Sequence, residues 1–472
     1  MESGEIYVQF FSVKNFIKPE QIVGEIPTNK ETYQETTRVA LPSMTESLLI
    51  ALISAVDMIM VGGIGADAIA SVGITNQPRF IIMALVLSLN VGVTVIVSRR
   101  IGEEKYENAN RCLRQAIVIS TVTSFILSLF GFVFARPIVS WAGATSEYVD
   151  MASIYFKSIM VGNFFYCISL TINAAQKGAG NTKIAMRTNI SANALNLCLN
   201  YLLINGIWIF PKWGVMGAGI ATSCGNILAF LMSFYSIMNT TTDDILRLQK
   251  EQSWKFDKKT IHDLYVISSS AFIEQIFMRI GFFLYSKTVA SLGMVAFATH
   301  NVCMNIINLS FSVGEGLSVA TSSLVGRSLG ANRTDLAIIY SKVTQRLGNV
   351  SSLLLGIFMI LFRIPLIRLF SNDPEIINAG TNIIFIIVLT LFFQIAQVVT
   401  SGCLRSAGDV KFIALLSLVS VTLIRPTLTY VLAFPLGLGL VGAWLSLFLD
   451  QLIRYFASIK RYNKAKWIDI KI

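Results

Sequence analysis

Long apolar windows follow one another along almost the whole chain. The 472 residues are 54% hydrophobic and only 14% charged, whereas a soluble protein of this size carries about 25% charged residues. Many windows of about 20 residues are apolar enough for a helix to cross a bilayer. Backbone polar groups must be satisfied internally in lipid, so these windows should form helices. The sequence therefore predicts an all-α polytopic membrane protein.

Twelve apolar windows predict twelve transmembrane helices. We place them at 39–63, 78–98, 115–137, 152–175, 185–210, 215–238, 263–289, 299–325, 346–369, 377–400, 411–435 and 438–458. Residues 1–37 carry mixed charges and no long apolar core, so they do not resemble a signal peptide. We expect a cytoplasmic N-terminal extension there, with an interfacial helix near Tyr7–Ile17.

Arg and Lys are concentrated in every second connection. Arg99 and Arg100 follow the second span, Arg327 follows the eighth, and Lys460 begins a basic tail. Cytoplasmic flanks carry such an excess, so we expect a multi-pass protein of the plasma (inner) membrane with both termini cytoplasmic. The net charge of +11 lies in these flanks and not in a compact basic domain. This distribution counts against a nucleic-acid partner.

Three short segments recur at one offset of 228 residues. GIGADAIAS at 63–71 resembles SLGMVAFAT at 291–299, VSRRIGEEKYENA at 97–109 resembles VGRSLGANRTDLA at 325–337, and QKGAGNTK at 176–183 resembles LRSAGDVK at 404–411. Each similarity is weak alone, but three at one offset and in order indicate an internal repeat. An even number of spans in each half makes it a parallel repeat.

The repeat divides the chain into two six-helix lobes. We expect an N-terminal lobe at 38–238, a cytoplasmic linker at 239–262, a C-terminal lobe at 263–459 and a basic cytoplasmic tail at 460–472. Two such bundles suggest a central cleft and alternating access by rocking of one lobe against the other.

The first span carries two acids, Glu46 and Asp57, eleven positions apart. At roughly 100° per residue they lie on one face at two depths. Carboxylates within membrane spans are costly and mark candidate functional sites, here a proton or cation path. Asp57 could instead reach the headgroups from an interfacial position. Glu46 has a repeat counterpart, Glu274, and both can be ion-paired structural residues, whereas the counterpart of Asp57 is Tyr285.

Four asparagines lie on one face of the fifth span. Asn189, Asn193, Asn196 and Asn200 follow each other at spacings of four, three and four residues. A stripe of amides is expensive in lipid, so it should face protein or a wet cavity. Amide oxygens can bind a hard cation, and amides can also hold helices together. The stripe is the expected neighbour of Asp57.

The second half offers further polar residues within its spans. Glu315 lies between two glycines, and Arg425 precedes Pro426, which should kink or open its helix. A buried Glu–Arg pair between helices is the structural alternative for these two. Asp450 and Arg454, four residues apart, are expected to form a local pair.

Signatures of an enzyme or an ATP-driven pump are missing from the sequence. It has no glycine-rich phosphate loop, Ser/His/Asp set or metal-ligand spacing. Its six cysteines are scattered, which indicates neither a disulfide framework nor a zinc site. We therefore expect no cofactor other than a coupling ion, and no enzymatic activity.

Several motifs together resemble those of the multidrug and toxic compound extrusion family of antiporters. They are Pro42, Val56-Asp57, Met60-Val61-Gly62, Gly65-x-x-Ala68-x-Ala70-x-Val72-Gly73, Lys177-Gly178-x-Gly180-Asn181-Thr182-Lys183 and Gly402-x-Leu404-Arg405-x-x-Gly408-Asp409. The resemblance covers the chain from about residue 36 and implies two six-helix lobes in a V around a central cavity. It also implies export of organic cations and other amphiphiles in exchange for protons or sodium ions.

The resemblance assigns family positions to particular residues. The family's first-span aspartate matches Asp57, its fifth-span Asn-x-x-x-Asp matches Asn196 and Asn200, and its seventh-span glutamate matches Glu274. An amide replaces the acid at Asn200, and Gln394 stands where some members have a tenth-span aspartate. The first lobe is then the better coupling site, where a sodium ion would bind near Asp57, Asn196 and Asn200.

Two functions follow from these residues. The first is a cation-coupled exporter of small molecules, expected to act as a monomer in contact with membrane lipid. The alternative is a flippase for lipids or lipid-linked oligosaccharides, because such proteins resemble this family distantly. A cavity dominated by Lys157, Arg279, Lys287 and Arg425 would favour the flippase.

Overall fold

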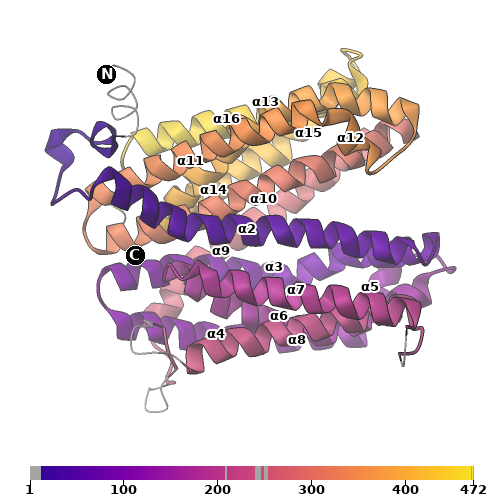
Figure 1. Cartoon of the computed structure of the whole chain (residues 1–472), viewed down its shortest axis with the longest axis horizontal. Helices are drawn as coiled ribbons and strands as arrows, with labels where there is room; N and C mark the ends of the chain where they lie inside the picture. The colour runs from indigo at the N-terminus through magenta and orange to yellow at the C-terminus, as the bar shows by residue number, and fades with distance from the viewer. Residues whose placement is uncertain (1–11, 208–209, 240–245, 249–253, 469, 471–472) are drawn as a thin grey trace. The chain divides into compact units, whose positions relative to one another are not determined.

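A computed structural model describes residues 12–207, 210–239, 246–248, 254–468 and 470. Within these ranges the regular structure is helical, with no β-strand (Figure 1). The long helices are α2 (Asn29–Gly62), α3 (Ala66–Gly102), α4 (Tyr106–Val133), α6 (Val149–Gly178), α7 (Thr182–Asn205), α8 (Gly214–Met238), α9 (Lys258–Ala290), α10 (Met294–Gly330), α11 (Thr334–Leu361), α13 (Pro374–Ser406) and α16 (Gly439–Asn463). Shorter elements are η1 (Val13–Phe16), η2 (Pro19–Gln21), α5 (Ala135–Trp141), α12 (Arg363–Arg368), α14 (Val410–Ser417), the π-helix η3 (Leu418–Ile424) and α15 (Arg425–Ala433).

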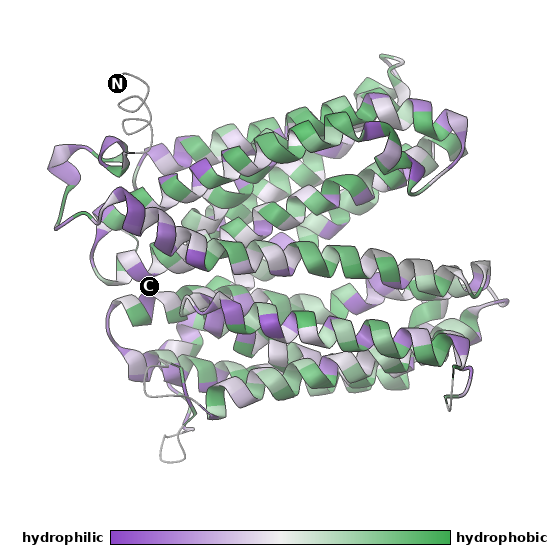
Figure 2. Cartoon of the chain, in the orientation of Figure 1, coloured by the Kyte–Doolittle hydropathy of each residue, from purple (hydrophilic) through white to green (hydrophobic). Residues whose placement is uncertain are grey.

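Each of the twelve predicted spans overlaps helix in the described chain, although the fifth was predicted to end at 210 and α7 ends at Asn205. Ten helices there are long and apolar enough to cross a membrane, and α2 and α7 are not among them. The asparagine stripe lowers the hydropathy of α7. Figure 2 shows hydrophobic residues along the middle of the helices and hydrophilic residues gathered towards their ends. Of the predicted interfacial helix, 7–11 lie outside the described residues, and η1 is a short 3-10 helix.

The internal repeat is confirmed by the helix boundaries. Helices α3 and α10 begin 228 residues apart and end 228 residues apart, and so do α4 and α11. Three pairs of left-handed backbone positions recur at this offset: Gly65 with Gly293, Glu104 with Asn332, and Gly180 with Gly408. Since positive φ is unfavourable for most residues, its recurrence at matching turns indicates a repeated backbone and not only repeated composition.

Contacts divide the chain into two compact units. One comprises 1–47 with 273–472, and the other comprises 48–272. Helices α2 and α9 therefore each belong partly to one unit and partly to the other. Val39 in the first half of α2 is buried in the hydrophobic core of the first unit. The predicted lobe boundaries at 38–238 and 263–459 stay a prediction.

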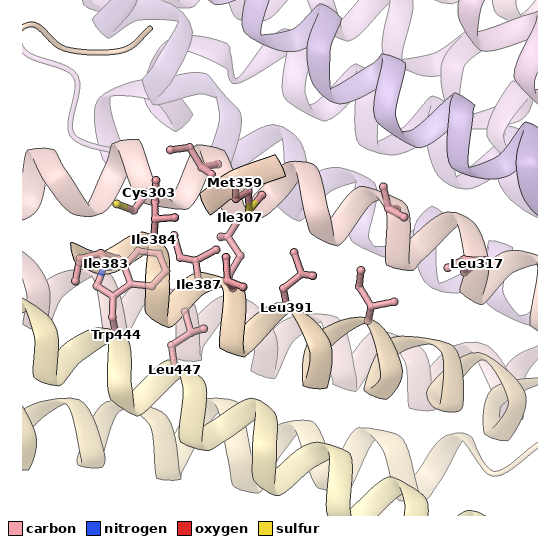
Figure 3. Packing of buried hydrophobic residues seen from close by; sticks show 14 of the residues in the cluster. Cys303, Ile307, Leu317, Met359, Ile383, Ile384, Ile387, Leu391, Trp444 and Leu447 are labelled. Atoms are coloured by element: carbon pink, nitrogen blue, oxygen red, sulfur yellow. The ribbon is translucent and has the colours of Figure 1, made fainter. Parts of the chain in front are cut away.

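The first unit is built around α13. Ile384, Ile387 and Leu391 on this helix are fully buried and pack against α10 and α16, where Trp444 is also fully buried (Figure 3). Apolar packing of this kind resembles a soluble core. In lipid, however, its stability comes from close packing and not from exclusion of water.

Small residues allow close helix packing in the second unit. A Cβ at Gly162 on α6 would lie 2.4 Å from the Cα of Ser223 on α8. The backbone N–H of Gly162 also donates to Oγ of Ser223 at 3.2 Å. Glycine at this position therefore brings α6 and α8 together and sets the spacing of the helices that carry the polar cavity described below.

The described part of the N-terminal extension packs on the start of α11. Asp335 accepts hydrogen bonds from the backbone N–H groups of Val23 and Gly24 at 3.2 and 3.3 Å. Arg333 donates to the backbone oxygen of Glu25 at 2.7 Å. These contacts, all within the first unit, fix the segment that leads into α2.

Candidate polar site in residues 48–272

A cavity of about 390 Å³ lies inside the unit formed by residues 48–272. Its lining comes from α2, α3, α6, α7 and α8, and includes one acid, Asp57, and one cation, Arg79. The four asparagines of α7 all line it, as their spacing on one helix face predicts. The cavity has the size of a small-molecule site and more polar groups than most such sites.

Hydrogen bonds connect Asp57 to the amides of α7. Nδ2 of Asn200 donates to Oδ1 of Asp57 at 2.9 Å and also approaches Oδ1 of Asn196 at 3.4 Å. Nδ2 of Asn196 in turn donates to Oγ1 of Thr222 on α8 at 3.2 Å. One chain of polar contacts therefore joins α2, α7 and α8 around the carboxylate.

These polar contacts leave one oxygen acceptor unused close to Asp57. Asn200 is 2% exposed, and its Oδ1 accepts no hydrogen bond from the described residues. Carboxylate, amide and hydroxyl oxygens are the ligands of hard cations such as Na⁺, and a carboxylate beside them can instead take up a proton. No group of three or more His, Cys, Asp and Glu side chains gathers in the described chain, so amide oxygens would have to complete a cation site.

Arg79 and Asn226 are cavity residues that the sequence analysis missed. The span containing Arg79 was predicted to begin at 78, which placed this arginine at a membrane boundary. Helix α3 instead begins at Ala66, so Arg79 lies well inside it. The only sequence signal was its position among the few basic residues outside the basic connections. Asn226 is a single amide in α8, and no spacing pattern marks it.

Glu46 does not join this site. It is 2% exposed, it is not part of the cavity lining, and it belongs to the unit that includes residues 273–472. The eleven residues between Glu46 and Asp57 correspond to about 17 Å of helix rise. The two acids of α2 therefore have different surroundings.

Glu274, the counterpart of Glu46, is ion-paired. Nη2 of Arg405 on α13 donates to Oε1 of Glu274 at 2.7 Å, and Glu274 is 4% exposed. The charge of Glu315 also acts on Arg405. Arg405, which comes from another helix, thus neutralises the charge of Glu274, the residue that matches the family's seventh-span glutamate.

Arg425 binds Asp450, which corrects one expected pair and excludes the alternative partner for Arg425. Nε of Arg425 donates to Oδ2 of Asp450 at 3.1 Å, with a further bond from its Nη2, and both residues are almost completely buried. The expected local pair of Asp450 with Arg454 is wrong, because the Asp450 carboxylate is held by Arg425 and by Ser420. Asp450, and not Glu315, is the ion-pair partner of Arg425.

The predicted opening of the helix at Pro426 is confirmed. The π-helix η3 ends directly before Arg425.

Gln394 is 6% exposed, and its Oε1 accepts no hydrogen bond from the described residues. Tyr285, the repeat counterpart of Asp57, is buried and donates from its hydroxyl to the backbone oxygen of Ala443 at 3.1 Å.

Comparison with known proteins agrees with this architecture. The family model described as MatE matches residues 42–202 and 270–431. A "Probable multidrug resistance protein NorM" of Thermotoga maritima is 26% identical over 454 residues, which is 96% of each chain. The "Uncharacterized transporter YisQ" of Bacillus subtilis is 25% identical and covers 90% of this chain and 93% of its own length.

Solved structures show the same fold. An outward-facing multidrug resistance MATE family transporter of the MOP superfamily matches with a TM-score of 0.86 at 19% identity, covering 92% of this chain and 97% of that one. A MOP superfamily transporter from Pyrococcus furiosus with a binding pocket of reversed polarity has a TM-score of 0.86 at 18% identity, covering 93% and 97%. The family model spans both halves of the repeat, so the chain belongs to the MatE family, whose members are membrane transporters and not enzymes.

Proposed function

We propose that this protein is a secondary active antiporter that exports organic cations or amphiphilic compounds in exchange for H⁺ or Na⁺. The observation that carries the proposal is the contact of Asp57 with Asn200 inside a polar cavity. A carboxylate in such a place can bind and release a small cation. The names of several relatives, which are probable multidrug resistance proteins, support the substrate class.

Asp57 is the coupling group in this proposal. In the loaded state it carries a proton, or it shares a sodium ion with oxygens of Asn196 and Asn200. Release of the ion restores the negative charge, and Asn200 continues to donate to the carboxylate. Since ion binding changes the local charge by one, the two states differ in their affinity for a charged substrate, and that difference is what couples the two fluxes.

Export then requires alternating access between two lobes, 38–238 and 263–459. We place both termini in the cytoplasm and the protein in the plasma membrane, because the basic residues lie in the connections that share a side with the termini. One chain contains both halves of the repeat, and we propose that it acts as a monomer in contact with membrane lipid.

The flippase alternative receives less support from the cavity. Lys157, Arg279, Lys287 and Arg425 do not occur in its lining. The first three are exposed, and Arg425 is ion-paired with Asp450. A cavity with one arginine and one acid differs from the strongly basic surface expected for anionic lipid headgroups.

The test measures efflux of a fluorescent organic cation from proteoliposomes, with a pH gradient or a sodium gradient imposed separately. We expect one gradient to drive efflux in the wild type, and Asp57→Asn to abolish it while leaving a monodisperse protein. Asp150→Asn is the matched control, because Asp150 is an exposed acid outside the cavity, paired with Arg136. Wild-type efflux by Asp57→Asn would contradict the proposal.

A further inference from the structure

Two buried hydrogen-bond donors line the cavity without an acceptor. They are Nε of Arg79 on α3 and Nδ2 of Asn226 on α8, and neither donates to any residue that the structure describes. Asn226 is 8% exposed, and no described carboxylate forms an ion pair with Arg79. Arg79 as a whole is half-buried, but its Nε is enclosed, and a buried donor without an acceptor is costly. These two donors are therefore available to an acceptor from outside the chain.

The donors lie at a different depth from Asp57. Consecutive helices run antiparallel, so the α2–α3 and α7–α8 connections lie at the same end of this unit. Asp57 and Asn200 lie five residues from that end of their helices, or about 8 Å at 1.5 Å per residue. Arg79 lies thirteen residues in and Asn226 twelve, or about 19 Å. The cavity thus has an acceptor end at Asp57 and a donor end roughly 10 Å deeper.

Electrostatic contacts agree with this placement. The charge of Arg79 acts on Tyr155 and also on Cys167, which lies twelve residues further along α6. The charge of Asp57 acts on Tyr155 as well. Tyr155, itself part of the lining, lies six residues into α6, or about 9 Å, so it is near the level of Asp57, and Arg79 lies between the levels of Tyr155 and Cys167.

We propose that Arg79 and Asn226 bind the anionic group of the transported compound, so that the substrate class includes carboxylate-bearing amphiphiles. A carboxylate accepts from a guanidinium and an amide at once, and such charge-assisted bonds are the stronger ones. The apolar part of the compound would contact Met83 and Phe80, which also line the cavity. The inference rests on the proposed export function and adds the recognition of an anion to it.

The charge balance gives the inference a consequence for coupling. With Asp57 ionised, the cavity carries one negative and one positive group. When Asp57 binds H⁺ or Na⁺, Arg79 leaves a net positive charge. A purely cationic substrate is then repelled, whereas a compound with a carboxylate still finds its counter-charge at the donor end. The carboxylate group should therefore contribute to binding in both ion states.

The experiment compares a rhodamine dye that has a free carboxylate with its methyl ester. Equilibrium binding to purified protein is followed by fluorescence polarisation without any gradient. We expect the wild type to prefer the acid and Arg79→Gln to lose roughly ten- to a hundredfold affinity for it, with ester binding unchanged. Arg79→Lys should restore part of the loss, because it keeps the charge but not the planar donor pair.

The controls separate recognition from folding and from coupling. Arg136→Gln is the matched control, because Arg136 is 65% exposed in its side chain and lies outside the cavity. Asn226→Leu repeats the test on the second donor if Arg79→Gln does not fold. Equal loss of acid and ester, or no loss of either, would overturn the inference. Failure of Asp57→Asn to stop gradient-driven efflux would instead overturn the export function, since dye binding is measured without a gradient.

Discussion

The buried pair of Arg425 and Asp450 allows a stability prediction with a magnitude. Asp450 is completely buried and Arg425 is 1% exposed. Asp450→Ala leaves the guanidinium without its counter-charge, and Ser420 on η3 also loses its acceptor. Removing one partner of a buried ion pair typically costs about 3–5 kcal/mol. We expect a loss of that size in the free energy of unfolding.

The two residues should not be independent. If their role is structural, the double variant with Arg425→Met and Asp450→Leu should lose much less free energy of unfolding than Arg425→Met and Asp450→Leu lose together as single variants, because no uncompensated charge remains. We expect an interaction energy of at least about 1–3 kcal/mol. The double variant should also retain ion-driven efflux, since in our proposal the coupling site lies in residues 48–272.

The assay is equilibrium unfolding of purified protein in mixed micelles, followed by tryptophan fluorescence. Trp444 on α16, about 1.7 turns of helix from Asp450, is completely buried and should report loss of packing there. Asp150→Asn serves as the exposed control. Additive effects of the two single substitutions would refute the structural reasoning. Loss of efflux in a stable double variant would show that Arg425 takes part in transport.

Three further predictions test other parts of the structure. Asp257 caps α9 through Thr260, and these hydrogen bonds lower the pKa of Asp257. The contribution of this cap to folding stability is therefore present above the unfolded pKa of Asp257 and should disappear as pH falls through the lower folded pKa. Asp257→Ala should remove about 0.5–2 kcal/mol of the free energy of unfolding at neutral pH, checked by thermal unfolding against pH. Asp335→Ala should release the N-terminal segment, detected as faster limited proteolysis before α2 with α11 unaffected. Gly162→Leu should prevent close packing of α6 and α8 and yield aggregated protein on size-exclusion chromatography, whereas Gly73→Leu, with open space around it, should not.

Helix number and repeat could be predicted from the sequence because both depend on local patterns. Hydropathy marks the part of each helix that is embedded in lipid, but not where the helix ends. Helix α3 begins at Ala66, twelve residues before the predicted start of its span at 78. The polar first turns continue the helix because their backbone hydrogen bonds are local. The sequence analysis did not predict Arg79 as a cavity residue for this reason.

Pairing between helices could not be predicted from the sequence. Arg405 and Glu274 are 131 residues apart, and Arg425 and Asp450 come from different helices. Their contacts depend on the relative rotation and depth of packed helices, which no periodicity specifies. By spacing in the sequence, Arg454 was the better candidate for the ion-pair partner of Asp450. The guanidinium of Arg425 is the partner in the structure.

The difference between Asp57 and Tyr285 explains why the N-terminal half of the repeat was the better candidate for the coupling site. Both halves repeat the backbone, yet at this level one carries a carboxylate and the other a phenol. The Tyr285 hydroxyl donates to a backbone oxygen and is buried, and it stays neutral at physiological pH. Asp57 instead faces a cavity in which Oδ1 of Asn200 accepts no hydrogen bond from the described residues. A repeated scaffold with a single carboxylate at this position can change its charge there in one half only, and the coupling that we propose at Asp57 depends on this asymmetry.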